Sequence, residues 1–143
     1  MSPDVATAVR WYTQAADAGH RVAAYRLGVL KRDGAPGVSR DEGAAFRWFE
    51  KSAQLGELDA ELALADAYFR GRGVRQNKTE GVVWYRTAAD HGLAEAQYQL
   101  GQLYARGDAV VKSDATAITW FQRAAAQGHT AARDELNRRG IKP

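Results

Sequence analysis

Four segments of the chain carry the hydrophobic spacing of an amphipathic helix, with apolar or small residues at steps of three and four. The spacing is clearest at Ala8, Trp11 and Ala15, at Ala45, Trp48 and Ser52, and at Ala117, Trp120 and Ala124, and Trp84 and Ala88 continue the series. Seven residues before each tryptophan stand Asp4, Asp41, Asn77 and Ser113. These side chains can accept hydrogen bonds from a first helical turn. We therefore predict four helices of one kind, named type B.

A second kind of helix, named type A, is predicted directly after each type B helix. Gly19, Gly56, Gly92 and Gly128 come eight residues after the tryptophans, and glycine can take the left-handed conformation that ends a helix. Each is followed by a small residue and a leucine on one face, namely Ala23 and Leu27, Ala60 and Leu64, Ala96 and Leu100, and Ala132 and Leu136. Gly28, Ala65 and Gly101 come next, and we expect them to face the bulk of a tryptophan.

The two helix types repeat at a fixed interval. The tryptophans are spaced 37, 36 and 36 residues apart, and the glycines after them keep the same intervals. Antiparallel helix pairs stacked at such a period form a solenoid in which each repeat packs on its neighbours. We predict an all-α fold, an αα-superhelix of about eight helices, in a single domain over residues 1–143. Repeats are expected near 20–55, 57–91 and 93–127, with partial units at 1–19 and 129–143.

The motif W-Y-x-x-A-A-x-x-G-x-x-x-A-x-x-x-L-G-x-x-Y-x-x-G is met most fully from Trp84 to Gly107. It resembles the Sel-one-like repeat, a relative of the tetratricopeptide repeat, and the resemblance covers nearly the whole chain. Departures from the motif are Ser52, Ala65, Lys31 and Gly81. The resemblance implies a right-handed solenoid that serves as a protein-binding scaffold or adaptor, of a kind found often in bacteria, and it implies no catalytic residues.

Composition and charge exclude some classes of protein but do not identify a partner. The chain is 45% hydrophobic and 26% charged, as in ordinary globular proteins, and it has no cysteine. No run of about 18 apolar residues is present, so we expect no membrane insertion. The first residues carry no secretory leader, which predicts a cytoplasmic location, or a periplasmic one if a leader has been removed. The net charge of +3 is too small to indicate a polyanionic partner.

No residue pattern indicates an enzyme, a cofactor or a metal. His20, His91 and His129 lie at the helix corners, where successive repeats are about 8–10 Å apart, whereas zinc needs ligand atoms about 2 Å away. We expect these histidines to be solvated. The sequence GRG at 71–73 lacks the lysine and hydroxyl residue of a phosphate loop. The four tryptophans and the aromatic residues after them are expected in the core rather than as platforms for nucleic-acid bases.

In the related tetratricopeptide fold, type A positions line the concave surface, and that analogy selects one set of candidate partner-binding residues. They are Tyr25, Asp59, Leu62, Asp66, Phe69, Arg70, Glu95, Tyr98, Gln102 and Arg106. Aromatic and arginine side chains are enriched in binding hot spots. The strip of Phe69, Arg70, Tyr98 and Arg106 suits a peptide with a carboxylate near an apolar side chain. Alternatively, Tyr25 and Tyr98 pack between helices and the charged residues pair with one another.

A second candidate surface is the edge formed by the loops from type A to type B helices. Its basic residues are Arg32, Arg40, Arg70, Arg72, Arg75, Lys78, Arg106 and Lys112. Such an edge could bind nucleic acid or an anionic surface by neutralising phosphates. Acidic residues occur on the same edge at Asp33, Asp41, Glu42, Glu80, Asp108 and Asp114. We therefore favour a mixed solvated edge, and a protein or peptide partner over nucleic acid.

The first predicted helix has no type A helix before it. Its apolar side chains at Val5, Val9 and Trp11 should pack on the next helix on one side and leave an apolar flank on the other. An exposed apolar patch promotes association. We therefore expect weak self-association through this N-terminal helix, or a longer natural chain.

Overall fold

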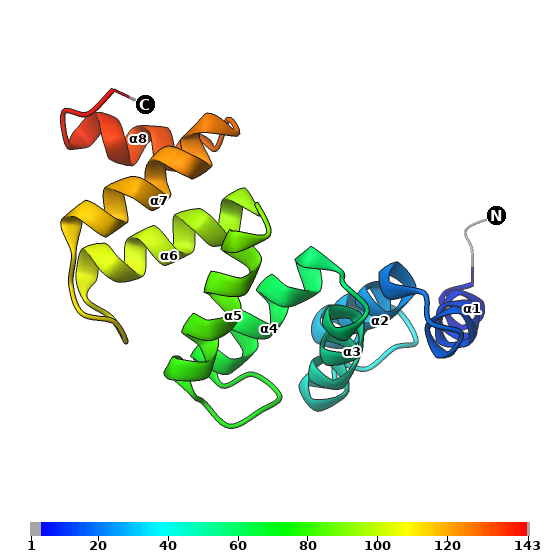
Figure 1. Cartoon of the computed structure of the whole chain (residues 1–143). Helices are drawn as coiled ribbons and strands as arrows, with labels where there is room; N and C mark the ends of the chain where they lie inside the picture. Colours follow the sequence, from blue (N-terminus) through cyan, green and yellow to red (C-terminus); the bar gives the residue numbers. More distant parts are fainter. Residues whose placement is uncertain (1–3, 143) are drawn as a thin grey trace. The chain divides into compact units, whose positions relative to one another are not determined.

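The computed structural model describes residues 4–142, and this part of the chain forms eight α-helices (Figure 1). They are α1 (Val5–Asp17), α2 (Arg21–Asp33), α3 (Glu42–Gln54), α4 (Leu58–Arg70), α5 (Lys78–Asp90), α6 (Ala94–Arg106), α7 (Asp114–Ala126) and α8 (Thr130–Arg138). The odd-numbered helices are the predicted type B helices and the even-numbered ones are type A. The predicted all-α fold class is thereby confirmed. Among the described residues, no helix has the length and apolar character that a membrane crossing requires.

The helices belong to two compact units. The first ends at Asn77 and contains α1 to α4, and the second begins at Lys78 and contains α5 to α8. Within each unit, every helix packs on the next one along the chain. This is the packing expected of a repeat protein, in which contacts are made between neighbours in sequence.

The four predicted helix starts are confirmed by the helix bounds, and three of them by a capping bond. The carboxylate of Asp4 accepts a hydrogen bond from the amide of Ala6 (3.1 Å), and that of Asp41 from Ala44 (2.9 Å). The hydroxyl of Ser113 accepts one from the amide of Thr116 (3.2 Å). Asn77 directly precedes α5. A cap of this kind typically stabilises its helix by about 1 kcal/mol.

The corner glycines also adopt the predicted conformation. Their φ angles are 93° at Gly19, 95° at Gly56, 97° at Gly92 and 89° at Gly128. Residues with a side chain larger than hydrogen rarely adopt these positive φ angles. Each glycine therefore allows the chain to reverse between a type B and a type A helix within a few residues.

In α3, α5 and α7, the aromatic residue that follows the tryptophan is buried. Exposed fractions are 3% for Phe49, 3% for Tyr85 and 0% for Phe121. The tryptophans are less buried: Trp120 is buried, Trp48 and Trp84 are half-buried, and Trp11 is 68% exposed. The prediction that all four tryptophans lie in the core is therefore wrong for Trp11 and correct only in part for Trp48 and Trp84.

The exposure of Trp11 has a physical reason. The equivalent residue Trp48 packs on a cluster formed by α1 and α2, the helices of the preceding repeat. No repeat precedes α1 in the part of the chain that the structure describes, so nothing covers Trp11. Val9 and Tyr12, on another side of α1, do pack on the α1–α2 cluster. The expected apolar flank at the N-terminal helix is therefore present.

The close helix approach predicted at Gly28 and Gly101 is present, but its partner differs from the prediction. A Cβ atom on Gly28 would lie 2.5 Å from the ring of Phe49, and one on Gly101 would lie 2.7 Å from the ring of Phe121. The small residue therefore faces the phenylalanine and not the tryptophan before it. One residue along an α-helix turns the side chain by about 100°, which is enough to exchange these two roles.

We predict that Gly101→Ala destabilises the protein, because the added methyl group collides with the Phe121 ring. Overpacking of this kind lowers the free energy of unfolding by about 1–3 kcal/mol, measurable by urea denaturation followed by circular dichroism. Gly43→Ala in α3 is the matched control, since its new Cβ would meet its nearest neighbour at 3.5 Å. That change should be neutral or slightly stabilising. Equal losses in the two variants would contradict this packing.

The unequal burial of the aromatic residues in the type B helices can also be tested by substitution. Phe121→Ala should lower the free energy of unfolding by about 3–5 kcal/mol. Trp11→Ala should change it by less than about 0.5 kcal/mol, because its side chain is largely in solvent. A large loss for Trp11→Ala in monomeric protein would contradict the exposed position of this side chain.

Self-association through α1 stays a prediction, and Trp11 is the residue to test. In sedimentation equilibrium at high protein concentration we expect a weak dimer, which Trp11→Ser should convert to monomer. Val111→Ser is a suitable control, because Val111 is also highly exposed but lies in a loop of the second unit. A parent protein that stays strictly monomeric would count against the prediction.

Candidate functional site

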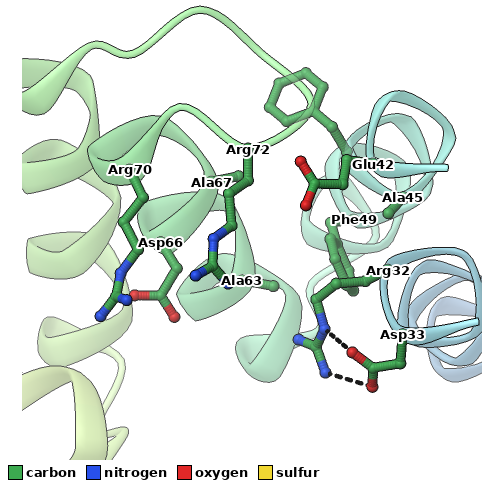
Figure 2. A pocket seen from close by; sticks show the side chains of 11 residues that line it. Arg32, Asp33, Glu42, Ala45, Phe49, Ala63, Asp66, Ala67, Arg70 and Arg72 are labelled. Carbon is green, nitrogen blue, oxygen red and sulfur yellow. Dashed lines mark hydrogen bonds and ion pairs between the residues drawn. The ribbon is translucent and has the colours of Figure 1, made fainter. Parts of the chain in front are cut away.

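The first unit contains a pocket of about 300 Å³ between α2, α3 and α4 (Figure 2). Its apolar lining consists of Ala45, Phe46, Phe49, Ala63 and Ala67, and its charged lining of Arg32, Asp33, Glu42, Asp66, Arg70 and Arg72. The pocket lies where the last turns of the two type A helices meet the first turns of α3, because α3 runs antiparallel to both. It is therefore built from the ends of three helices and the loop after α4.

Phe49 and its neighbours form a fixed aromatic wall. The Phe49 ring is held against Gly28, and its centroid lies 5.7 Å from that of Tyr25. Phe46 packs edge-on against Tyr68, with 5.3 Å between ring centroids. The guanidinium carbon of Arg32 lies 5.7 Å from the Phe49 ring centroid. Aromatic contacts of this geometry are attractive beyond the area they bury, so the wall is in place before any ligand arrives.

All three charged residues of the pocket on the α2–α3 side already have partners. Arg32 donates two hydrogen bonds to Asp33, Nε to Oδ1 at 2.9 Å and the terminal nitrogen to Oδ2 at 3.2 Å. These bonds lower the pKa of the Asp33 carboxyl and raise the pKa of Arg32. Glu42 forms an ion pair with Arg40 at 3.6 Å. None of these groups needs a ligand to balance its charge.

Arg70 and Arg72 differ from Arg32 in this respect. Neither forms an ion pair with another residue in the range 4–142. Figure 2 shows both on the α4 side of the pocket, with the Arg72 side chain pointing toward Ala63 and Asp66. Both residues are exposed. The pocket thus has two arginine side chains without a carboxylate partner beside an aromatic wall.

The structure brings only part of the predicted binding face to this pocket. Asp66 and Arg70 line it. Tyr25 is half-buried against Phe49, and burial first, then the charge of Asp59, raise the pKa of its hydroxyl. Leu62 and Phe69 are half-buried on α4 and lie outside the pocket lining.

In the second unit, three predicted residues form a polar network around His129. The Tyr98 ring stacks on the His129 ring, with 4.7 Å between centroids, and Gln102 donates a hydrogen bond to the Tyr98 hydroxyl at 2.6 Å. Glu95 Oε2 lies 2.6 Å from His129 Nε2. Arg106 is exposed at the end of α6. Tyr98 also lies against Phe121, with 5.9 Å between centroids, so it has a packing role here.

His129 is not the solvated corner histidine that the sequence suggested. Its side chain is 16% exposed, and its Nδ1 accepts a hydrogen bond from the amide of Ala132 (3.2 Å). It thus caps the start of α8 while its other nitrogen binds Glu95. His20 and His91 are exposed. Within the described part of the chain, no three histidine or acidic side chains are grouped so as to hold a metal ion.

Sequence reasoning missed the contribution of Phe46 and left Arg72 out of the predicted binding face. Phe46 stands where the other type B helices have Val9, Val82 and Ile118, and this aromatic exception is a signal that could have pointed to the pocket. The type A face and the basic loop edge were treated as competing surfaces, with Arg70 counted on both and Arg72 only on the loop edge. In the first unit these two surfaces meet at one pocket.

Comparisons with known proteins agree with the repeat pattern. The family model for the Sel1 repeat matches residues 1–20, 21–57, 58–93 and 94–129. No curated protein matches the chain.

Several solved structures are similar. One is c5321, a protective antigen of uropathogenic Escherichia coli with an SLR fold, at 31% identity and a TM-score of 0.88; the match covers 94% of this chain but only 30% of that one. A Sel1 repeat protein from Oxalobacter formigenes has 34% identity and a TM-score of 0.79, over 88% of this chain and 94% of the other.

Cysteine rich protein B of Helicobacter pylori shares the fold at 20% identity, with a TM-score of 0.73 over 93% of this chain and 95% of that one. The repeat period, the paired helices and the match of the family model lead to one conclusion. The chain belongs to the Sel1 repeat family.

Proposed function

We propose that the chain is a non-enzymatic scaffold that binds a peptide or protein segment through the faces of its type A helices. Sel1 repeat solenoids are generally protein-interaction scaffolds. The observation that carries the proposal for this chain is the pocket beside α4, where Arg70 and Arg72 have no ion-pair partner among the described residues and the Phe46–Phe49 wall is already packed. A ready-formed apolar wall beside polar groups that can fix a ligand's orientation is a general feature of binding sites.

Binding of nucleic acid or an anionic surface through the basic loop edge is the other function proposed from the sequence. Several cations of that edge are engaged by neighbouring carboxylates: Arg32 by Asp33, Arg40 by Glu42, and Lys78 by Asp108 at 3.1 Å. Neutralised cations contribute little to phosphate binding. This observation favours the type A faces over the loop edge.

A random dodecapeptide display library, selected on the immobilised protein, tests the proposal directly. We expect recovered peptides to share a short consensus and to bind in fluorescence anisotropy with an affinity that persists at high salt. Binding that disappears at high salt, together with retention of nucleic acid, would favour the loop edge. Failure to select any peptide would count against the scaffold proposal.

The contribution of the type A faces is testable by substitution. Arg70→Ala in the first unit or Arg106→Ala in the second should weaken the binding of a selected peptide by about 1–3 kcal/mol. This is the usual range for a charged hydrogen bond or a hot spot. Both side chains are exposed, so the melting temperature should hardly change. Tyr98→Ala is a poorer probe, because Tyr98 packs on Phe121 and His129. Unchanged affinity in both arginine variants would move the binding site away from these faces.

A further inference from the structure

The pocket in the first unit exists because two positions of α4 carry alanine. Aligning the repeats through Leu64 and Leu136 places Ala63 opposite Glu135 of α8, and Ala67 opposite Arg139, the residue directly after α8. Both alanines line the pocket. The two small side chains leave space that larger side chains occupy in the second unit.

In the second unit, Glu135 and Arg139 fill the corresponding space between α7 and α8. The Nε atom of Arg139 donates a hydrogen bond to Oε1 of Glu135 at 3.3 Å. The same guanidinium lies 3.7 Å from the carboxylate of Asp114 and 5.7 Å from the ring centroid of Phe121. The chain thus supplies an internal carboxylate and an internal cation to its second copy of this site.

The first unit keeps the rest of the site. Phe49 corresponds to Phe121, and Glu42 corresponds to Asp114. The guanidinium of Arg32 stands over the Phe49 ring at 5.7 Å, as that of Arg139 stands over Phe121. The carboxylate that Glu135 provides in the second unit has no counterpart at Ala63, and Arg72 points toward that alanine (Figure 2).

We propose that the pocket between α2, α3 and α4 binds an acidic side chain of a peptide, whose carboxylate pairs with Arg70 and Arg72 beside Ala63. An apolar side chain next to it in the peptide lies against Phe46 and Phe49. This inference rests on the proposed scaffold function and names the ligand chemistry of one site within it. Paired arginines favour carboxylates because each guanidinium can donate two parallel hydrogen bonds.

Size and charge both favour a single acidic side chain. A pocket of about 300 Å³ is at the lower end of the range for ligand sites, which suits one or two side chains. The carboxylates of Asp66 and Glu42 also line the pocket. Their negative charges would repel a phosphate dianion more strongly than a carboxylate monoanion. A phosphorylated ligand or a nucleic acid is therefore the less suitable occupant.

Two acetylated dipeptide amides serve as minimal probes, Phe-Glu and its uncharged twin Phe-Gln. Titrated into ¹⁵N-labelled full-length protein, Phe-Glu should shift the backbone amide signals of α4 residues around Ala63 and Ala67. Phe-Gln should bind roughly 10-fold more weakly or not at all, because it cannot form charged hydrogen bonds with the arginines. Equal binding of the two, or shifts confined to the second unit, would overturn the proposal.

Variants of Ala63 test the space and the charge separately. Ala63→Glu places in the first unit the residue that α8 carries at this position, and glutamate is a good helix former, so the variant should fold. It should abolish Phe-Glu binding, because its own carboxylate would occupy the site. Ala63→Gln fills the space without charge and should weaken binding less. Gln122→Glu, which adds the same charge at an exposed position of α7, is the matched control and should bind as the parent does.

The arginine variant that separates this pocket from the rest of the type A face is Arg72→Ala. It should weaken the binding of Phe-Glu roughly 10- to 100-fold, as expected for loss of a charged hydrogen bond, whereas Arg133→Ala, at an exposed position of α8, should leave that dipeptide's affinity unchanged. If library peptides bind Ala63→Glu as tightly as the parent, the chain is a peptide scaffold but this pocket is not its acidic subsite. If no library peptide binds the parent, the scaffold proposal itself fails.

Discussion

The contact between a phenylalanine ring and a helical glycine sets the geometry on which the rest of each unit depends. Phe49 against Gly28 joins α2 to α3, and Phe121 against Gly101 joins α6 to α7, with no room for a Cβ atom at either glycine. Because the ring fills the space of the missing side chain, the two backbones approach closely and interior packing stays dense. The buried leucines and alanines of the same helices then have fixed neighbours.

That contact also explains how two copies of one site can differ. The Phe49 and Phe121 rings present one side to a glycine and another to the space bordered by the following type A helix. Residues at that border, such as Ala63 and Glu135, do not take part in the ring–glycine contact. One copy can therefore be closed by an internal ion pair and the other left open without any change in how the helices of each pair are joined.

Most of the fold could be predicted from the sequence, because the repeat period places caps, corner glycines and small residues at recognisable intervals. Asp41, Ser113 and Gly56 have the predicted roles. The exchange of roles between Trp48 and Phe49 could not be predicted, since adjacent aromatic residues share the same period and only the rotation of the helix decides which is buried. The ion pairing of the pocket's arginines could not be predicted from the sequence either. Whether Arg32 or Arg72 has a partner depends on side-chain geometry that spacing does not encode.

The unequal burial of the four tryptophans gives the chain a built-in set of optical reporters. Trp11 is 68% exposed, whereas Trp120 is buried and carries the Arg123 guanidinium at 4.7 Å from its ring centroid. Indole emission moves to shorter wavelength as water is excluded from the ring, and dissolved quenchers such as iodide reach only exposed rings. Iodide quenching therefore reports on the exposure of Trp11 in α1, and the emission that iodide does not quench includes that of Trp120 in α7. No added label is needed.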